Sequence, residues 1–217
     1  MRELCWSKPR NDQNHEDAKL VIKRLESFLF HTSRITVRCH IVGKKGREIV
    51  KVNIDQLLKD LNSAYADEWI AFFYYSWAAD FVEGLSFPGV ASKLDDIAKE
   101  EFEHLSELAE RIFELGGEPE RDFEDLQRIA NCKKVVFPKG ERELEGGLKN
   151  VIEAEGCAID VYNKLIKSIS PCYEKDLRTF HLIEHILSEE IQHEEAFESL
   201  LSKKLKEPKK ARTKARK

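Results

Sequence analysis

The sequence predicts an all-α protein: a four-helix bundle with a long crossover between its second and third helices, preceded by a small helix and β-hairpin extension. Three observations support this prediction. Four long stretches repeat apolar residues at steps of three and four, which is the pattern of an amphipathic helix. A connection of roughly 28 residues separates the second stretch from the third. Each of the four stretches also carries a glutamate in the middle of its apolar stripe.

Length and composition favour a folded, globular chain. The 217 residues suit one domain with extensions, and 41% hydrophobic with 35% charged residues is unlike a disordered protein. No apolar run approaches the roughly 20 residues of a membrane span. The N-terminus has no apolar segment of the signal-peptide type, so we expect a cytoplasmic protein without a membrane partner. The five cysteines are odd in number and widely scattered, which argues against a disulfide framework.

Residues 1–52 are predicted to form the N-terminal extension. Residues 16–30 place apolar side chains at helical spacing, so a short amphipathic helix is expected there. Apolar and polar residues then alternate over residues 34–41, and the Gly-Lys-Lys-Gly at 43–46 is a turn signal, which together predict a hairpin. Because an isolated hairpin is marginal in water, we expect it to pack on the bundle or on a neighbouring subunit.

The main domain is predicted over residues 53–202. Asn53 is a suitable cap for the first helix, and Gly116 and Gly117 followed by Pro119 end the second. Pro171 ends the third helix. The expected helices cover residues 53–84, 87–115, 147–168 and 175–203, with a short helical piece at 123–131 inside the crossover.

Residues 203–217 form a basic tail. They hold nine Lys and Arg and one Glu, a charge of +8, which leaves −12 on the other 202 residues of a chain whose net charge is −4. A basic tail on an acidic body can touch polyanions such as DNA, although a disordered, solubilising end is the simpler interpretation.

The central glutamates of the four stripes are the candidate functional residues. Burying one uncompensated carboxylate costs several kcal/mol, and four would exceed the roughly 5–15 kcal/mol net stability of a typical domain. Two divalent metal ions would offset the four negative charges. The second and fourth helices add a histidine three residues after their glutamate, on the same helix face, which completes the expected ligands of a dinuclear site. The predicted ligands are Glu68, Glu101, His104, Glu155, Glu190 and His193.

The helical register selects among neighbouring acidic residues. Glu155 lies on the apolar stripe of the third helix, whereas Glu153 lies on its polar side. In the fourth helix, Glu190 is three residues before the histidine, and Glu189 is expected to face solvent with His181 and His185. The first and third helices each carry a tyrosine seven residues after their glutamate, Tyr75 and Tyr162. Either hydroxyl could bond a ligand or be oxidised, but a core role is favoured.

Over residues 53–202 this constellation resembles the ferritin-like superfamily, and most closely its Dps-like branch with a bacterioferritin-type di-iron site. The two E-x-x-H pairs carry the resemblance, together with two cysteines, Cys132 in "ANC" and Cys157 in "EAEGC". By that resemblance the cysteines form a thiol/disulfide pair beside the metals. Two buried small hydrophobic residues are the alternative interpretation. Residues 1–52 fall outside the resemblance.

The resemblance implies a ferritin-like bundle that binds two Fe ions per subunit, with Mn possible. It implies oxidation of Fe(II), preferably by hydrogen peroxide although dioxygen is possible, and storage of Fe(III) in a homo-oligomeric cage, with a 12-mer favoured. Such a reaction protects against oxidative stress. Two alternatives stay open: a manganese catalase-like or rubrerythrin-like peroxidase on the same bundle, and a Dps-type protein that binds DNA non-specifically through the basic tail.

Overall fold

The computed structural model describes residues 43–82, 89–132, 144–169 and 176–206. The chain divides into two compact units, Met1–Ile41 and Val42–Lys217, and all of the described residues belong to the second unit. The predicted helix at 16–30, the first strand of the predicted hairpin, Cys5, Cys39, Cys172 and residues 207–217 of the tail lie outside the described residues.

The part of the hairpin prediction that falls on described residues is wrong. The expected turn is instead the start of helix α2 (Lys44–Glu48), and none of the described residues forms a strand. Glu48 pairs with two lysines of the preceding turn, at 3.7 Å from Lys44 Nζ and 3.5 Å from Lys45 Nζ, which favours the helical conformation. Val50 then packs into the core of the bundle, so an apolar residue expected in a strand anchors the entry to the next helix.

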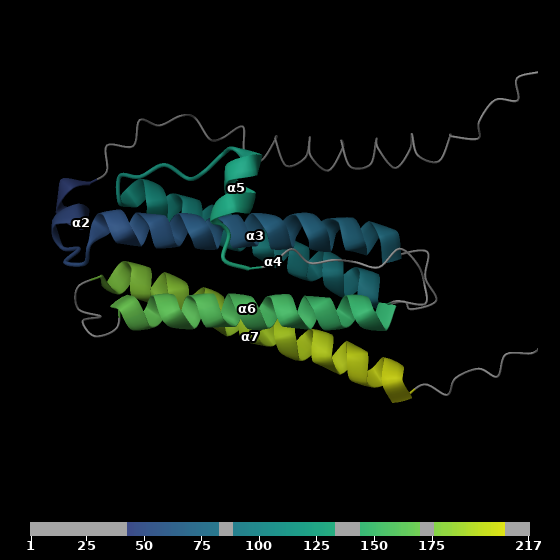
Figure 1. The fold of residues 1–217 in the computed structure, drawn as a ribbon. Helices are drawn as coiled ribbons and strands as arrows, with labels where there is room; N and C mark the ends of the chain where they lie inside the picture. The colour runs from purple at the N-terminus through teal and green to yellow at the C-terminus, as the bar shows by residue number, and fades with distance from the viewer. Residues whose placement is uncertain (1–42, 83–88, 133–143, 170–175, 207–217) are drawn as a thin grey trace, which may run out of the picture. The chain divides into compact units, whose positions relative to one another are not determined.

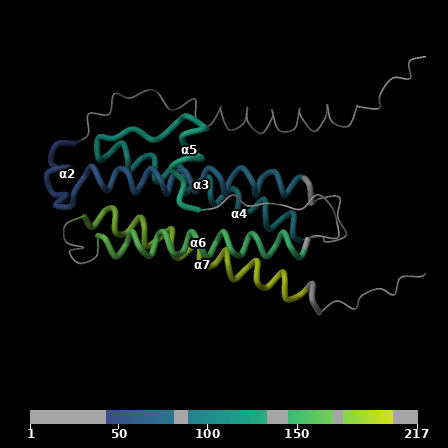
Figure 2. The backbone as a smooth tube through the Cα atoms, in the orientation of Figure 1, coloured from purple at the N-terminus to yellow at the C-terminus, as the bar shows by residue number. Residues whose placement is uncertain are grey.

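Four long helices form the bundle as two pairs (Figure 1). Helix α3 (Ile54–Val82) packs mainly on α4 (Val90–Glu114), and α6 (Leu144–Ile169) packs mainly on α7 (Leu177–Lys206). The crossover between the pairs contains the short helix α5 (Phe123–Ile129), which lies against α3 (Figure 2). The all-α four-helix prediction is confirmed. None of the helices that the structure describes is both long and apolar enough to span a lipid bilayer.

Two apolar clusters fill the bundle, one towards each end. On α3, Leu57 and Leu61 belong to the first cluster, and Tyr75 and Ala78 belong to the second. Each fully buried leucine-sized side chain contributes about 1.5–3 kcal/mol, so these clusters hold the helices together on both sides of the middle layer. Glu68 lies on α3 between the two clusters, and the middle layer is therefore where the structure buries its carboxylates.

Two glycines close the C-terminal end of α4. Gly117 N donates to Ile112 O and Gly116 N donates to Phe113 O, which is the Schellman arrangement that closes a helix C-terminus. Gly116 adopts φ +87°, a left-handed conformation that favours glycine. A Cβ on Gly117 would lie 2.5 Å from Leu58 Cδ2, so a larger residue here would require the Leu58 side chain of α3 to move.

A buried ion pair ties the end of α4 to the start of α7. Arg111 donates to Asp176 Oδ1 at 2.8 Å and to Thr179 Oγ1 at 2.7 Å. Asp176 also caps α7, because its Oδ1 accepts from the Thr179 backbone at 3.1 Å. This contact fixes the two helices that carry the histidines relative to each other.

Candidate metal centre

All six predicted ligands meet in the middle layer of the bundle. Each helix contributes one glutamate, α4 and α7 each add a histidine, and all six side chains are buried. They form two overlapping groups in which the ligand atoms lie within 4.8 Å of one another. The first group is Glu68, Glu101, His104 and Glu190; the second is Glu101, Glu155, Glu190 and His193.

Glu101 and Glu190 belong to both groups, and each group adds one further glutamate and one histidine. His104 Nδ1 lies 3.2 Å from Glu190 Oε1 and 3.5 Å from Glu101 Oε2. His193 Nδ1 lies 3.2 Å from Glu101 Oε1 and 3.8 Å from Glu190 Oε2. Two shared carboxylates between two histidines match the donor set of a dinuclear carboxylate site, with one metal position on each side.

The inward-facing atoms of this cluster are suited to binding cations. Both carboxylate oxygens of Glu101, Oε1 of Glu190 and Nδ1 of both histidines are buried without a hydrogen-bond partner. Buried polar atoms are normally bonded, so five unpartnered atoms facing one space indicate a ligand. Carboxylate oxygen and imidazole nitrogen suit first-row divalent metals such as iron and manganese.

A second pair of glutamates holds the histidines from outside. Glu189 Oε2 lies 2.8 Å from His104 Nε2, and Glu100 Oε2 lies 2.7 Å from His193 Nε2. A carboxylate that accepts from Nε2 fixes the imidazole ring and leaves Nδ1 directed at the centre. The prediction that Glu189 simply faces solvent is therefore wrong, because its carboxylate contacts His104. Glu100 was not predicted at all, yet both E-x-x-H motifs are preceded directly by a glutamate, and that repeat was its signal.

The two tyrosines connect the pairs of helices across the centre. Tyr75 on α3 donates to Glu155 Oε1 on α6 at 2.7 Å, and Tyr162 on α6 donates to Glu68 Oε1 on α3. Burial and nearby carboxylates raise the pKa of both hydroxyls well above the usual value, so they remain donors. A core role alone does not describe them, because each one orients a carboxylate of the opposite pair.

Burial and neighbouring charges shift the pKa of three of the central carboxylates, and not all in the same direction. Burial and the charges of Glu101 and Glu190 raise the pKa of Glu68 well above its usual range. Burial and the same two charges raise the pKa of Glu155. Burial also opposes ionisation of Glu101, but its contacts with Glu68 and both histidines outweigh this effect and lower its pKa.

The pKa of both histidines is raised, whereas burial alone would lower the pKa of an imidazole. Burial alone lowers a histidine pKa, but Glu101 and Glu190 raise the pKa of His193 to about 11. Contacts with Glu101, Glu190 and Glu68 raise the pKa of His104 as well. In the metal-free protein, protons on the two histidines and on Glu68 and Glu155 thus offset the buried charge, and metal binding must displace protons.

The remaining predictions on register agree with the structure. Glu153 is exposed while Glu155 is buried, and His181 and His185 are exposed on α7. His185 Nε2 lies 3.6 Å from Glu189 Oε2, which places this surface histidine next to the carboxylate that holds His104.

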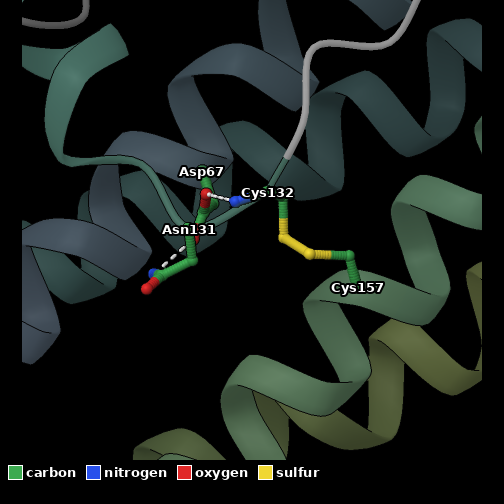
Figure 3. The surroundings of a disulfide bond; sticks show 4 residues. All are labelled: Asp67, Asn131, Cys132 and Cys157. Atoms are coloured by element: carbon green, nitrogen blue, oxygen red, sulfur yellow. Dashed lines mark hydrogen bonds between the residues drawn. A yellow bond between two sulfur atoms is a disulfide. The ribbon is translucent and has the colours of Figure 1, made fainter.

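Cys132 and Cys157 are joined by a disulfide beside the centre, with a Cα–Cα distance of 5.8 Å (Figure 3). Cys132 belongs to the crossover, and Cys157 lies on α6 two residues after Glu155. A cavity of about 30 Å³ adjoins Cys132 and reaches the cluster, with room for roughly two water-sized molecules. Its lining includes Asp67, Tyr75, Cys132 and all four central glutamates.

A four-helix bundle that buries glutamates from every helix and histidines from two of them has the donor set of the dinuclear carboxylate class of proteins. Comparison with known proteins is more specific. A family model described as the ferritin-like domain matches residues 58–205. The chain belongs to the ferritin-like family, and within it to the Dps-like branch.

Three relatives illustrate this membership. The DNA protection during starvation protein of Pyrococcus furiosus is 35% identical over 153 residues, which cover 70% of this chain and 80% of the relative. The bacterioferritin of Desulfovibrio desulfuricans is 27% identical over 146 residues, covering 67% and 74% of the two chains. The structure of a dodecameric thioferritin, the bacterioferritin-related protein of Bacteroides fragilis, superposes with a TM-score of 0.67 at 30% identity, covering 75% of this chain and 95% of that one.

Proposed function

We propose that the protein is a di-iron ferroxidase that oxidises Fe(II), preferably with hydrogen peroxide, and stores the Fe(III) product. The observation that carries this proposal is the pair of overlapping ligand groups that share Glu101 and Glu190. Glu68 and His104 would complete one iron position, and Glu155 and His193 the other. The related bacterioferritin of Desulfovibrio desulfuricans is described with a diiron site, which supports iron as the metal.

Two iron ions held side by side supply two electrons to one oxidant. Oxidation of two Fe(II) by one hydrogen peroxide consumes two protons and gives two Fe(III) and two water molecules, so no hydroxyl radical is released. The cavity beside the centre has room for one molecule of hydrogen peroxide. The outer glutamates, Glu100 and Glu189, hold the imidazole rings. The two tyrosines hold the terminal glutamates, which are Glu68 and Glu155. These contacts would keep the donor atoms in place during the reaction.

Storage requires an assembly. We propose a cytoplasmic cage of twelve subunits, because the Bacteroides fragilis relative is described as dodecameric and this chain covers 95% of it. The acidic body of the chain, −12 outside the tail, would attract Fe(II).

Anaerobic loading followed by peroxide titration tests the proposal. The protein is given Fe(II) without oxygen, and Fe(III) absorbance is followed as hydrogen peroxide is added. We expect about one peroxide consumed per two Fe(II). The Glu101→Ala variant should lose this reaction, whereas Glu103→Ala, an exposed position on the same helix, should retain it. Iron that does not co-elute with the protein after repeated additions would instead favour a catalase- or peroxidase-type enzyme, as would turnover with Mn.

Non-specific DNA binding through residues 203–217 is a second candidate, favoured by the +8 charge of this segment. The relative from Pyrococcus furiosus carries DNA protection in its name. Binding through phosphates would weaken steeply with salt. A gel-shift series with the full chain and with a chain lacking residues 207–217 would separate this activity from iron oxidation.

A further inference from the structure

Helix α3 holds the crossover at two separate points. At the first, Asn62 donates to Glu118 O at 3.3 Å and accepts from Glu120 N at 2.8 Å. At the second, Asp67 Oδ1 accepts from Cys132 N and Asp67 Oδ2 accepts from the Asn131 side chain, both at 2.8 Å (Figure 3). The second point lies beside the metal centre, and the first does not contribute to it.

Asp67 is an unusual residue for such a contact. Its side chain is 7% exposed, and both of its oxygens are used by two consecutive residues of the crossover. A buried carboxylate needs donors of this kind, and hydrogen bonds to a charged group are about twice as strong as neutral ones. Asp67 directly precedes Glu68, so the same turn of α3 holds both the crossover and a candidate ligand.

Cys132 is attached on both sides. Its backbone is held to α3 by Asp67, and its sulfur is bonded to Cys157 on α6. The two cysteines are 25 residues apart in sequence, and bringing together the ends of such a segment costs conformational entropy. Any contact that already holds Cys132 in place removes part of this cost.

We propose that Asp67 is the positioning residue of the cysteine pair: its carboxylate holds the Cys132 backbone so that the two thiols stay within reach of each other when the disulfide is reduced. The disulfide then re-forms with a high effective concentration. In the exchange with glutathione, the two thiols of the pair lose two protons and two electrons to one oxidised glutathione, which leaves as two reduced molecules. This inference concerns the pair itself and does not depend on the proposed iron chemistry.

The test measures the equilibrium constant of this exchange in the full-length, metal-free protein. The protein is equilibrated in glutathione buffers of defined ratio, free thiols are alkylated, and mass spectrometry quantifies the peptides of Cys132 and Cys157. Asp67→Ala should lower the constant by roughly ten-fold or more, which corresponds to losing a charged hydrogen-bond acceptor. Asn62→Ala removes the other attachment of the crossover and should leave the constant within roughly two-fold of the wild type.

An exchange of the two side chains provides a rescue. In the double variant Asp67→Asn with Asn131→Asp, the amide on α3 donates to the carboxylate on the crossover, and its oxygen still accepts from Cys132 N. This variant should recover most of the constant lost in Asp67→Ala. Asp67→Asn alone retains one acceptor, so its exchange constant should lie between those of Asp67→Ala and the double variant. It replaces Asp67→Ala in the test if Asp67→Ala does not fold, as judged by far-ultraviolet circular dichroism.

Three results would overturn the proposal. The first is an unchanged exchange constant in Asp67→Ala or, if that variant does not fold, in Asp67→Asn. The second is an equal loss in Asn62→Ala, and the third is a double variant whose constant is no higher than that of Asp67→Ala. Because no iron is present, none of these results bears on whether the protein oxidises Fe(II). Conversely, a protein that fails the peroxide titration can still show the ten-fold loss.

Discussion

The α3–α4 half and the α6–α7 half of the bundle contribute matching sets of residues to the centre. Each half supplies one terminal glutamate, one shared glutamate, one histidine and one outer glutamate. The contacts between the halves are reciprocal as well, since the tyrosine of each half donates to the terminal glutamate of the other. Each contact that one half makes to the centre therefore has an equivalent contact made by the other half.

The halves differ where the crossover meets them. The α6–α7 half carries Cys157 two residues after its terminal glutamate, and the α3–α4 half has Ile70 at the corresponding place. The α3–α4 half carries Asp67 directly before its terminal glutamate, where the other half has Ala154. The metal ligands are thus duplicated, whereas the cysteine pair and its attachment occur on one side of the centre among the described residues. We expect the halves to behave alike in metal binding and differently in redox chemistry.

Removing a shared carboxylate should have the largest effect, because it belongs to both ligand groups. Glu101→Ala and Glu190→Ala should each abolish binding at both positions, so that calorimetric titration with Mn(II) finds no ion where the wild type takes two. Glu103→Ala is the matched control, since this side chain is exposed on the same helix. Retention of one ion by either variant would mean that the two metal positions do not both depend on this carboxylate.

Removing a terminal carboxylate should remove one ion and leave the other. Glu68→Ala should retain the position next to His193, and Glu155→Ala the position next to His104. The same titration should give one ion for each variant with similar affinity. A marked difference between the two variants would break the equivalence of the halves and would point to the neighbouring disulfide as its source.

Removing an outer glutamate should weaken binding without changing its stoichiometry. Glu100→Ala and Glu189→Ala free the Nε2 side of a histidine, and loss of such a partner typically lowers metal affinity about 10–100-fold. Competition with a metal chelator would measure the loss. Glu195→Ala, an exposed position on α7, should show none, and the proposed role fails if its affinity falls as far as that of Glu189→Ala.

The tyrosines should give the smallest effect. Tyr75→Phe and Tyr162→Phe each remove one buried hydrogen bond to a carboxyl group and should lower the free energy of unfolding by about 1–2 kcal/mol in the metal-free protein. Urea denaturation at a single protein concentration measures this change. Equal losses would sharpen the equivalence of the halves, and no loss in either variant would restore the simpler core role.

Helical periodicity was sufficient to place the six central residues, because a stripe that repeats at 3.6 residues decides which side of a helix faces the core. The choice of Glu155 over Glu153 rested on that register alone. Helical periodicity does not predict contacts between helices. Glu189 and Glu100 lie beside the apolar stripe, and which histidine each one contacts depends on how α4 and α7 pack. The alternation before Gly43 suggested a hairpin, but local pairs of Lys44, Lys45 and Glu48 favour a helix over residues 44–48.

The reciprocal tyrosine bonds also bear on the ancestry of the bundle. In each helical hairpin, the tyrosine hydroxyl that donates to the terminal glutamate comes from the other hairpin. A single ancestral hairpin with these residues would complete the whole centre on pairing with an identical copy about a twofold axis. Gene duplication and fusion of such a hairpin would yield the present arrangement, with the crossover as the joining segment. The cysteine pair, tied to that joining segment, would then be younger than the centre it adjoins.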